Sequence, residues 1–490
     1  MNKVRARKVP SGRSCWGCKA KRLVCDFEQP SCNKCKARGV ECPGYDKKPL
    51  VWIPDGQVKS CGRRHRQEQL VPCRVPGMLG RAWIDSCRPF EVVTYYNSCI
   101  APDAVCAADA WGPEDQHYIP LEFARDIPEA ALSSLTCIVL GHRILQSQDD
   151  AYRVQLSYRL RGCRSNAIRA VSRQISAGEL AKDDDTLWAV LLLFLADVQQ
   201  ALTFDWRPHL DGASTLIDLR GGMSSFALST NNFKQVVLYY ILADVMGRTT
   251  SPSMTLEKAE AHLRLTQLIP ELYHNGMRTS CPCPPELFQY IILVNYQRAL
   301  LNEMDVTEEI RRNTAMNILD QINAFCPEDW VHETFGTQSG CSPSEGSSRV
   351  NMLSGWLYLA SSYQCAAAVY CLGALLNGHR RTEAEGADVL SPLETDDLSR
   401  LKIDELPQDG MQRAYHAVLM YYLTQMMRLD GEGSGYGKLA VWPIVIAGMG
   451  VPQGDEGSKE FIRRHLRAAS SVLGTSSTLV AINVLEKIWT

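Results

Sequence analysis

The sequence predicts a small zinc-stabilised domain followed by a large all-α domain. Six of the 19 cysteines fall within 28 residues near the N-terminus, and positive charge is concentrated around them. From about residue 120 onward, apolar residues recur mostly at helical spacing. Because 490 residues are too many for one compact core, we expect about two to four structural units.

The cysteine cluster is an internal repeat. Its spacing is Cys-x2-Cys-x6-Cys-x6-Cys-x2-Cys-x6-Cys, and adding 17 to the first three positions gives the last three. Two separate tetrahedral zinc sites would need eight ligands, so six cysteines must share two thiolates in one binuclear centre. So short a segment buries almost no apolar core, and metal binding must supply most of its folding free energy. The predicted ligands of two Zn²⁺ ions are Cys15, Cys18, Cys25, Cys32, Cys35 and Cys42.

Charge is distributed unevenly along the chain. Residues 1–66 contain 17 Lys and Arg against 5 Asp and Glu, whereas the remainder contains 35 against 49. Six thiolates and two Zn²⁺ ions together carry about −2, so the loaded basic segment keeps a formal charge of about +10. A basic segment on an acidic chain favours a polyanionic partner such as double-stranded DNA, although a solvated basic tail has the same charge balance.

Residues 14–26 (SCWGCKAKRLVCD), with 29–35 and 40–45, resemble the fungal Zn2Cys6 binuclear-cluster transcription factors. RING, LIM and zinc-ribbon domains need eight ligands, and the cluster contains no histidine. The resemblance implies that Cys15 and Cys32 are the bridging thiolates. Their equivalence under the 17-residue repeat supports this assignment independently.

The two halves of the repeat differ in their basic residues. The first contains the pair Lys21-Arg22, whereas the second has Gly39 at the position equivalent to Arg22. Domains of this type place a helix in the major groove, where Lys or Arg can donate to guanine. The resemblance implies that Lys21 and Arg22 read a CGG-like triplet. Val24 departs from the family, which usually has a basic residue there, and we expect this to weaken a phosphate contact without affecting the zinc ligands. The other predicted DNA contacts are Lys19, Lys34, Lys36, Arg38, Arg63 and Arg64, each of which is a solvated surface charge in the alternative interpretation.

Four segments follow from these patterns. We predict a basic arm at 1–14, the Zn2Cys6 DNA-binding domain at 15–42, a linker with a basic stretch at 43–89 and an all-α domain at 90–490. Short basic runs in the arm and linker add phosphate contacts or act as a nuclear import signal, so a nuclear protein is expected. Many relatives dimerise through a coiled coil after the cluster. The linker shows no sustained heptad, and homodimerisation therefore stays open.

The large domain shows helical periodicity without a persistent strand pattern. Gly221-Gly222 is typical of a helix end, and the longest apolar run, Leu187–Ala196, is half as long as the roughly 20 residues of a membrane span. We therefore expect a buried helix there and no membrane partner. Segments 335–349 and 380–409 are predicted to be loops or disordered inserts. The predicted helices are 128–147, 151–176, 184–202, 208–220, 231–247, 286–303, 308–324, 351–377, 410–429 and 457–488.

Three stretches of the large domain resemble the second family of fungal-specific transcription factor domains. They are His209–Gly222, Trp442–Gly448 and Leu485–Trp489. The resemblance implies a regulatory domain over residues 90–490, in which these stretches have packing roles. Trp442, for example, would fill the core.

The sequence does not predict an enzyme. It contains no Gly-rich phosphate loop, no G-x-S-x-G and no H-E-x-x-H. His209 beside Asp211 is interpreted as a polar residue at a helix start, and the pair Cys281 and Cys283 as structural. The expected function is zinc-dependent, sequence-specific transcription regulation of RNA polymerase II genes, with coregulators or a small effector binding the large domain. The alternative is a zinc-stabilised protein-interaction module with weak or no specific DNA binding, which would lack a steep salt dependence of DNA affinity.

Overall fold

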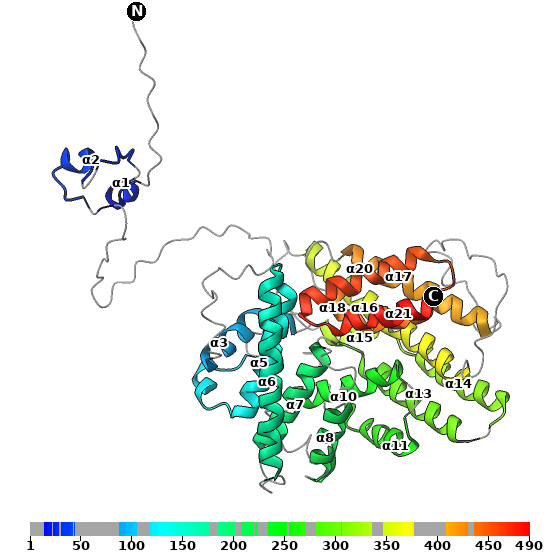
Figure 1. Ribbon diagram of the computed structural model, residues 1–490. Helices are drawn as coiled ribbons and strands as arrows, with labels where there is room; N and C mark the ends of the chain where they lie inside the picture. The colour runs from blue at the N-terminus through cyan, green and yellow to red at the C-terminus, as the bar shows by residue number, and fades with distance from the viewer. Residues whose placement is uncertain are drawn as a thin grey trace, which may run out of the picture. The chain divides into compact units, whose positions relative to one another are not determined.

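The chain divides into two compact units, residues 1–69 and 70–490, which we call the head and the body. Every regular element within the described ranges is a helix, and these ranges contain no strand (Figure 1). This confirms the predicted fold class. The computed structural model describes residues 14–21, 23–28, 31–42, 44, 88–104, 118–176, 184–200, 207–219, 221–223, 234–251, 254–270, 281–304, 306–335, 346–376, 408–429 and 436–490.

The head contains two short helices, α1 (Trp16–Ala20) and α2 (Asn33–Lys36). Each begins directly after a cysteine of a Cys-x2-Cys pair. The N-cap of α2 is Cys32, whose thiol accepts a hydrogen bond from the backbone N–H of Cys35 at 3.4 Å. Helices this short are not stable alone, so the sulfur cluster must hold them in place.

The N-terminal part of the body is built around α5, which packs between α6 and α7. The predicted buried helix at Leu187–Ala196 is present as the central part of α7, where Phe194 is buried against the edge of the Tyr240 ring. The elements here are α3 (Pro89–Tyr95), η2 (Tyr96–Ile100), α4 (Ala101–Ala104), η4 (Leu121–Arg125), α5 (Glu129–Gln146), α6 (Asp150–Ser176), α7 (Asp184–Gln200) and α8 (Arg207–Asp218).

The C-terminal part of the body is organised by α16, which contacts α13, α14, α15, α17, α18 and α19. The side chains of Trp356 and Tyr363 on α16 are fully buried. The helices are α10 (Lys234–Thr249), α11 (Leu256–Leu265), α13 (Pro285–Glu303), α14 (Glu308–Asn323), α15 (Pro327–Phe335), α16 (Gly346–Leu376), α17 (Gln408–Leu429), α18 (Tyr436–Leu439), α19 (Val441–Met449), α20 (Glu456–Leu473) and α21 (Ser477–Trp489).

One helix within the described residues, at Asn351–Leu376, is long and apolar enough to cross a membrane. However, 78% of its apolar window is buried inside the body. A core helix of a soluble protein has the same length and composition, so this segment is weak evidence for a membrane span.

Two sequence predictions about the body need correction. The single helix predicted at 457–488 is wrong, because α20 and α21 are separated at Gly474, which has φ +60° and acts as a left-handed C-cap. The segment 335–349, predicted to be a loop, is partly helical, since α15 ends at Phe335 and α16 begins at Gly346. In contrast, Gly221 and Gly222 follow α8 with positive φ, as expected of a helix end.

The two C-terminal stretches singled out in the sequence pack against each other. Trp489 donates a hydrogen bond from Nε1 to the carbonyl oxygen of Gly448 at 2.8 Å, and Leu485 packs where a Cβ on Gly448 would lie. Trp442 stacks on Tyr363 and donates to the hydroxyl of Thr249 at 3.0 Å. These contacts support the packing role inferred from the resemblance.

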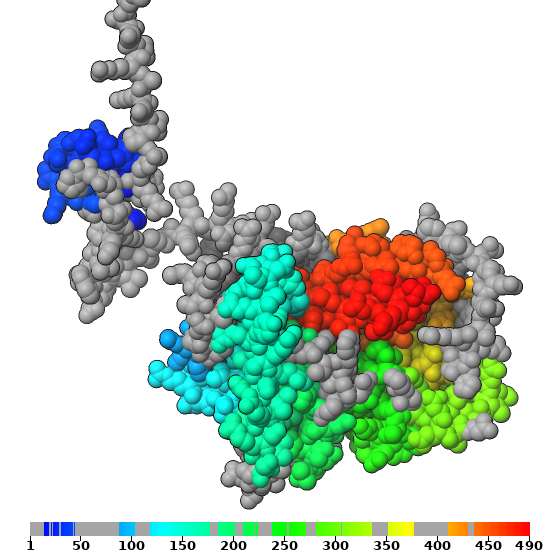
Figure 2. All heavy atoms as spheres, in the orientation of Figure 1, coloured from blue at the N-terminus to red at the C-terminus, as the bar shows by residue number. Residues whose placement is uncertain are grey.

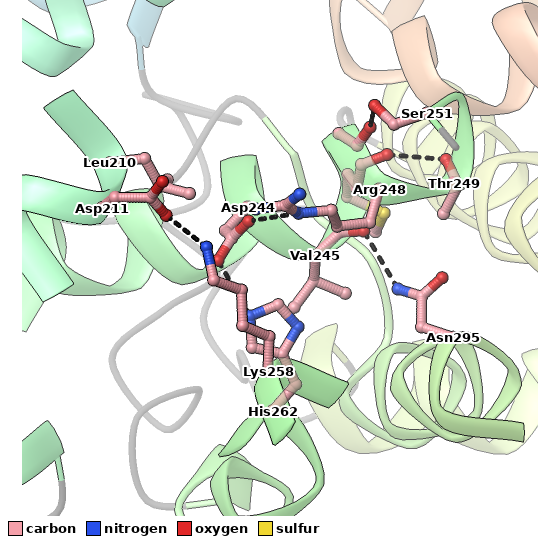
Figure 3. A network of polar contacts seen from close by, with 12 residues as sticks. Leu210, Asp211, Asp244, Val245, Arg248, Thr249, Ser251, Lys258, His262 and Asn295 are labelled. Atoms are coloured by element: carbon pink, nitrogen blue, oxygen red, sulfur yellow. Dashed lines mark hydrogen bonds and ion pairs between the residues drawn. The ribbon is translucent and has the colours of Figure 1, made fainter. Parts of the chain in front are cut away.

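A network of polar contacts joins α8, α10, α11 and α13, buried around Asp244 and half exposed at Asp211 and Lys258 (Figure 3). The carboxylate of Asp244 on α10 accepts hydrogen bonds from Arg248 at 3.0 Å and His262 at 2.8 Å. Burial would raise the pKa of Asp244, but the His262 and Arg248 interactions hold it below the ordinary value. Beside it, Asp211 and Lys258 join α8 to α11 at 2.6 Å. Both carboxylate oxygens of Asp244 are paired, which fits a structural role, whereas Nδ1 of His262 is buried without a hydrogen-bond partner among the described residues.

Candidate metal centre and nucleic-acid interface

The 17-residue sequence repeat is also a structural repeat. The thiol of Cys15 accepts from the N–H of Cys18 at 3.3 Å, as Cys32 does from Cys35 at 3.4 Å. The backbone N–H of Leu23 donates to the Cys18 carbonyl at 2.9 Å. The equivalent bond, from Val40 to the Cys35 carbonyl, measures 3.2 Å.

The equivalence extends to a backbone conformation, positive φ, that non-glycine residues rarely adopt. Phe27 has φ +61°, and it is the non-glycine residue with positive φ in the described chain. Its counterpart 17 residues later is Gly44, with φ +77°. The backbone N–H of Trp16 donates to the Gly44 carbonyl at 3.1 Å, which joins the two ends of the cysteine-containing segment. Both halves therefore fold the same way around the cysteines.

The sulfur atoms are spaced as zinc requires. Four tetrahedral ligands at a Zn–S distance of about 2.3 Å place neighbouring sulfurs roughly 3.8 Å apart. The Sγ atom of Cys15 lies 3.6 Å from that of Cys32 and 3.8 Å from that of Cys35, and Cys18 lies 3.7 Å from Cys32. These four thiols are buried and lie within 4.8 Å of one another. The geometry of the chain thus fits the metal.

The remaining two cysteines complete two groups of four. The thiol of Cys25 lies within 4.8 Å of Cys32 and also interacts with Cys18. The thiol of Cys42 interacts with those of Cys15 and Cys32. The family resemblance implies one group of Cys15, Cys18, Cys25 and Cys32 and another of Cys15, Cys32, Cys35 and Cys42, and these contacts fit that division. The two groups share Cys15 and Cys32.

Packing thiols this closely makes ionisation costly unless a cation is present. The hydrogen bond with Cys32 and burial raise the pKa of Cys35 to about 12, and burial also raises the pKa of Cys18. A thiolate is the form that binds zinc, so a divalent cation must compensate the charge for the cluster to ionise.

Several predicted DNA contacts lie on the surface of the head. Lys21 follows α1, and Lys34, Lys36 and Arg38 lie on or just after α2, all with exposed side chains. Val24 is 85% exposed, so its departure from the family pattern leaves the sulfur cluster unaffected. Lys19 lies on α1, but its side chain is outside the described residues, as are Arg22, Arg63 and Arg64.

The body does not extend this centre within the residues that the structure describes. The groups of cysteine, histidine and carboxylate found close enough for a metal lie in the head. Cys283 is fully buried, and Cys281 contacts the hydroxyl of Tyr363 at 3.5 Å, which supports the structural interpretation of this pair. His209 contacts the buried carboxylate of Asp197 at 3.1 Å, a partner that sequence proximity to Asp211 did not indicate.

Two overlapping groups of four sulfurs with exposed lysines beside them define a binuclear zinc domain of the DNA-binding class. Comparison with known families agrees over nearly the whole chain. Residues 13–50 match the fungal Zn(2)-Cys(6) binuclear cluster domain, and residues 91–490 match the fungal specific transcription factor domain. The chain belongs to the fungal Zn2Cys6 transcription factors that have this second domain. It is a DNA-binding transcription factor whose head binds two zinc ions.

Individual relatives are also regulators. The phomenoic acid biosynthesis cluster-specific transcriptional regulator of Leptosphaeria maculans is 25% identical over 491 residues, covering 97% of this chain and 86% of that protein. The transcription factors phomR and phomR' of Diaporthe leptostromiformis are each 36% identical over 64 residues, 13% of this chain and 10% of theirs. No solved structure matches the chain.

Proposed function

We propose that the head reads a CGG-containing DNA site through the first half of its repeat, and that Cys15, Cys18, Cys25, Cys32, Cys35 and Cys42 are the ligands of both zinc ions. The observation that carries the proposal is the pair of sulfur groups sharing Cys15 and Cys32, since it fixes α1 and α2 as equivalent elements. Two equivalent elements with different basic residues can divide base recognition from phosphate contact.

The repeat makes this division specific. Lys21 is equivalent to Arg38, and Arg22 is equivalent to Gly39, so only the first half has two adjacent cations. We assign Lys21 and Arg22 to guanine O6 and N7 in the major groove. We assign the other predicted cations to phosphates, which position the head without selecting a sequence. The phosphate group comprises Lys19, Lys34, Lys36, Arg38, Arg63 and Arg64.

The matched pair Lys21→Ala and Arg38→Ala tests the assignment, because the two positions are equivalent in the repeat. Lys21→Ala should weaken binding to a CGG-containing duplex by about 1–3 kcal/mol and change binding to a random duplex little. Arg38→Ala should weaken binding to both duplexes by the same factor and reduce the slope of log K against log salt by about one. Titrations of the zinc-loaded chain at several salt concentrations measure both effects.

Equal losses on both duplexes for Lys21→Ala would contradict base recognition by the first half. A wild-type chain that binds the CGG duplex no better than the random duplex, with a shallow salt dependence, would instead favour the protein-interaction module.

The body is proposed to regulate the head rather than to catalyse a reaction. We infer that it binds transcriptional coregulators or a small-molecule effector, and that the protein acts in the nucleus on RNA polymerase II genes. The relative from Leptosphaeria maculans is named as a cluster-specific regulator and aligns over almost all of this chain, which supports control of a biosynthetic gene cluster. Binding-site mapping in cells would test this, since bound sites spread evenly over unrelated genes would contradict it.

A further inference from the structure

The helix α6 presents a continuous exposed stripe on the surface of the body. Figure 2 shows α6 in view along most of its length, and its opposite face packs into the core through residues such as Leu156 and Leu160. The stripe repeats every three or four residues, which is one face of an α-helix, and spans roughly 33 Å. Its members, all exposed, are Val154, Tyr158, Arg161, Ser165, Arg169, Ser172 and Ser176, and we call them the α6 stripe.

The α6 stripe combines apolar and aromatic surface with positive charge. Tyr158 is 69% exposed and Val154 is 56% exposed, and because they lie four residues apart on one helical face they form a joint apolar surface. The guanidinium of Arg161 lies over the Tyr158 ring, 5.6 Å from its centroid. Arg169 is held by Asn166 at 3.0 Å and by the Ser165 carbonyl at 3.3 Å. Neither arginine forms an ion pair with a described carboxylate.

A groove continues the α6 stripe toward the C-terminal end of the helix. Its volume is about 660 Å³, and Arg169, Ser172 and Ser176 of the stripe line it together with Asn166, Arg173 and Glu129 of α5. Arg173 and Glu129 approach at 3.4 Å, and both side chains are 69% exposed. An exposed pair of this kind is weak, so an incoming carboxylate can replace Glu129 at little cost.

The amino-acid composition of α6 indicates which of two polyanions, DNA or an acidic protein segment, fits this surface better. The sequence of α6 contains six arginines, no lysine and one aspartate, although the body as a whole is acidic. Phosphate contacts on DNA use lysine and arginine alike, and they gain nothing from exposed Val154. Protein interfaces are enriched in arginine and tyrosine and depleted in lysine. The composition therefore favours a protein partner.

We propose that the α6 stripe is a docking surface for an acidic amphipathic segment of a partner protein. Carboxylates of the partner pair with Arg161 and Arg169, and its apolar side chains cover Val154 and Tyr158. The proposal rests on the proposed regulatory role of the body and names the surface and the chemical class of partner for it.

The test uses the full-length, zinc-loaded chain and a labelled synthetic 20-residue peptide with Asp and Glu on one helical face and Leu and Phe on the other. Fluorescence anisotropy should show binding, and a peptide with Asn and Gln in place of the acids should bind at least about tenfold more weakly. The double variant Arg161→Glu/Arg169→Glu should lower the affinity for the acidic peptide by at least about tenfold, and Tyr158→Ala should lower it by about fivefold or more.

Arg153→Glu is the matched control. It reverses one charge on the same helix, the same change as each half of the double variant, but it lies off the stripe and pairs with Asp150 at 3.3 Å. Its peptide affinity should stay within about twofold of the wild type. Thermal unfolding of each variant checks folding, and Tyr158→Ala gives an independent answer if the double variant is destabilised.

Three outcomes would overturn the docking surface. These are no binding of the acidic peptide, equal losses for the stripe variants and Arg153→Glu, or loss of random-duplex binding in the double variant, which would make the stripe a DNA contact. Concentration-dependent dimerisation that the stripe variants abolish would assign it to a second copy instead. The CGG-duplex affinity of the same preparations reports on the head separately, so failure there leaves the peptide result interpretable.

Discussion

The carboxylate of Asp197 on α7 is held at two points by Arg164 on α6, with distances of 2.8 Å to Nε and 2.9 Å to Nη2. The side chain of Asp197 is fully buried, and His209 at the start of α8 contacts it at 3.1 Å. The three residues lie far apart in the sequence and join three helices. Because a buried charge needs such partners, the pair constrains how these helices pack.

Replacing Asp197 with Asn should lower the free energy of unfolding of the body by about 3 kcal/mol. The substitution leaves the Arg164 charge, which is only 22% exposed, without its ionic partner. Asp150→Asn is the control, since Asp150 is 92% exposed where it pairs with Arg153 and should contribute within about 0.5 kcal/mol. Chemical denaturation measures both values. Equal effects of the two variants would contradict a structural role for the buried pair.

The pair of Asp197 and Arg164 also predicts how the stability of the body depends on pH. Burial would raise the pKa of Asp197, but hydrogen bonds from Arg164 and His209 and their charges hold it below its ordinary value near 4. A lowered pKa means that the stabilisation is complete above about pH 4, the pKa in the unfolded state. It is lost as pH falls through the folded-state pKa. The stability difference between wild type and Asp197→Asn should therefore be constant above about pH 5 and narrow in acid, as measured by denaturation at several pH values. A difference that widens in acid would contradict this sign.

Gly474 should not tolerate a side chain. Its φ of +60° costs an L-residue about 1–2 kcal/mol, and a Cβ there would overlap the ring of buried His142. We expect Gly474→Ala to destabilise the body by about 2–4 kcal/mol. Gly457→Ala, inside α20 with no close obstacle to a Cβ, should instead be neutral or stabilising by up to about 1 kcal/mol. The melting temperatures of both variants test this pair, and a drop shared by both would assign the effect to α20 in general.

Metal content should follow the two overlapping sulfur groups. The purified chain should contain two zinc ions, and Cys25→Ala, which removes a ligand from one group, should retain about one. Cys15→Ala removes a shared ligand from both groups, so it should release both ions and unfold the head. Cys281→Ala in the body is the control and should keep two. Native mass spectrometry gives these counts, and a wild-type stoichiometry near one would contradict the shared-thiol arrangement.

Removing zinc should separate the two units functionally. A chelator should abolish DNA binding, because the head has almost no apolar core of its own. The body buries a large core of apolar side chains, so its helical circular dichroism and unfolding transition should stay unchanged. Collapse of the body on chelation would reveal a metal site beyond the six clustered cysteines.

The metal centre could be predicted from sequence because its information is local. All six cysteines lie within 28 residues, and the 17-residue period alone relates Cys15 to Cys32. Ligand number and tetrahedral geometry then leave few arrangements. The longer helices of the body were also predicted, since the 3.6-residue period of apolar residues is a local signal too, whereas the shorter α3, α11, α15 and α19 were not.

Contacts between distant segments were decided only by the tertiary structure. His209 and Asp211 are neighbours in the sequence, whereas in the fold His209 contacts Asp197 and Asp211 pairs with Lys258. The break at Gly474 is another example, because the carbonyl of Gly474 accepts from the side chain of Gln200, 274 residues earlier. Periodicity tells which face of a helix is apolar. Which neighbour covers that face depends on packing between segments that no local pattern relates, and for this reason the exposed stripe of α6 emerged only from the folded body.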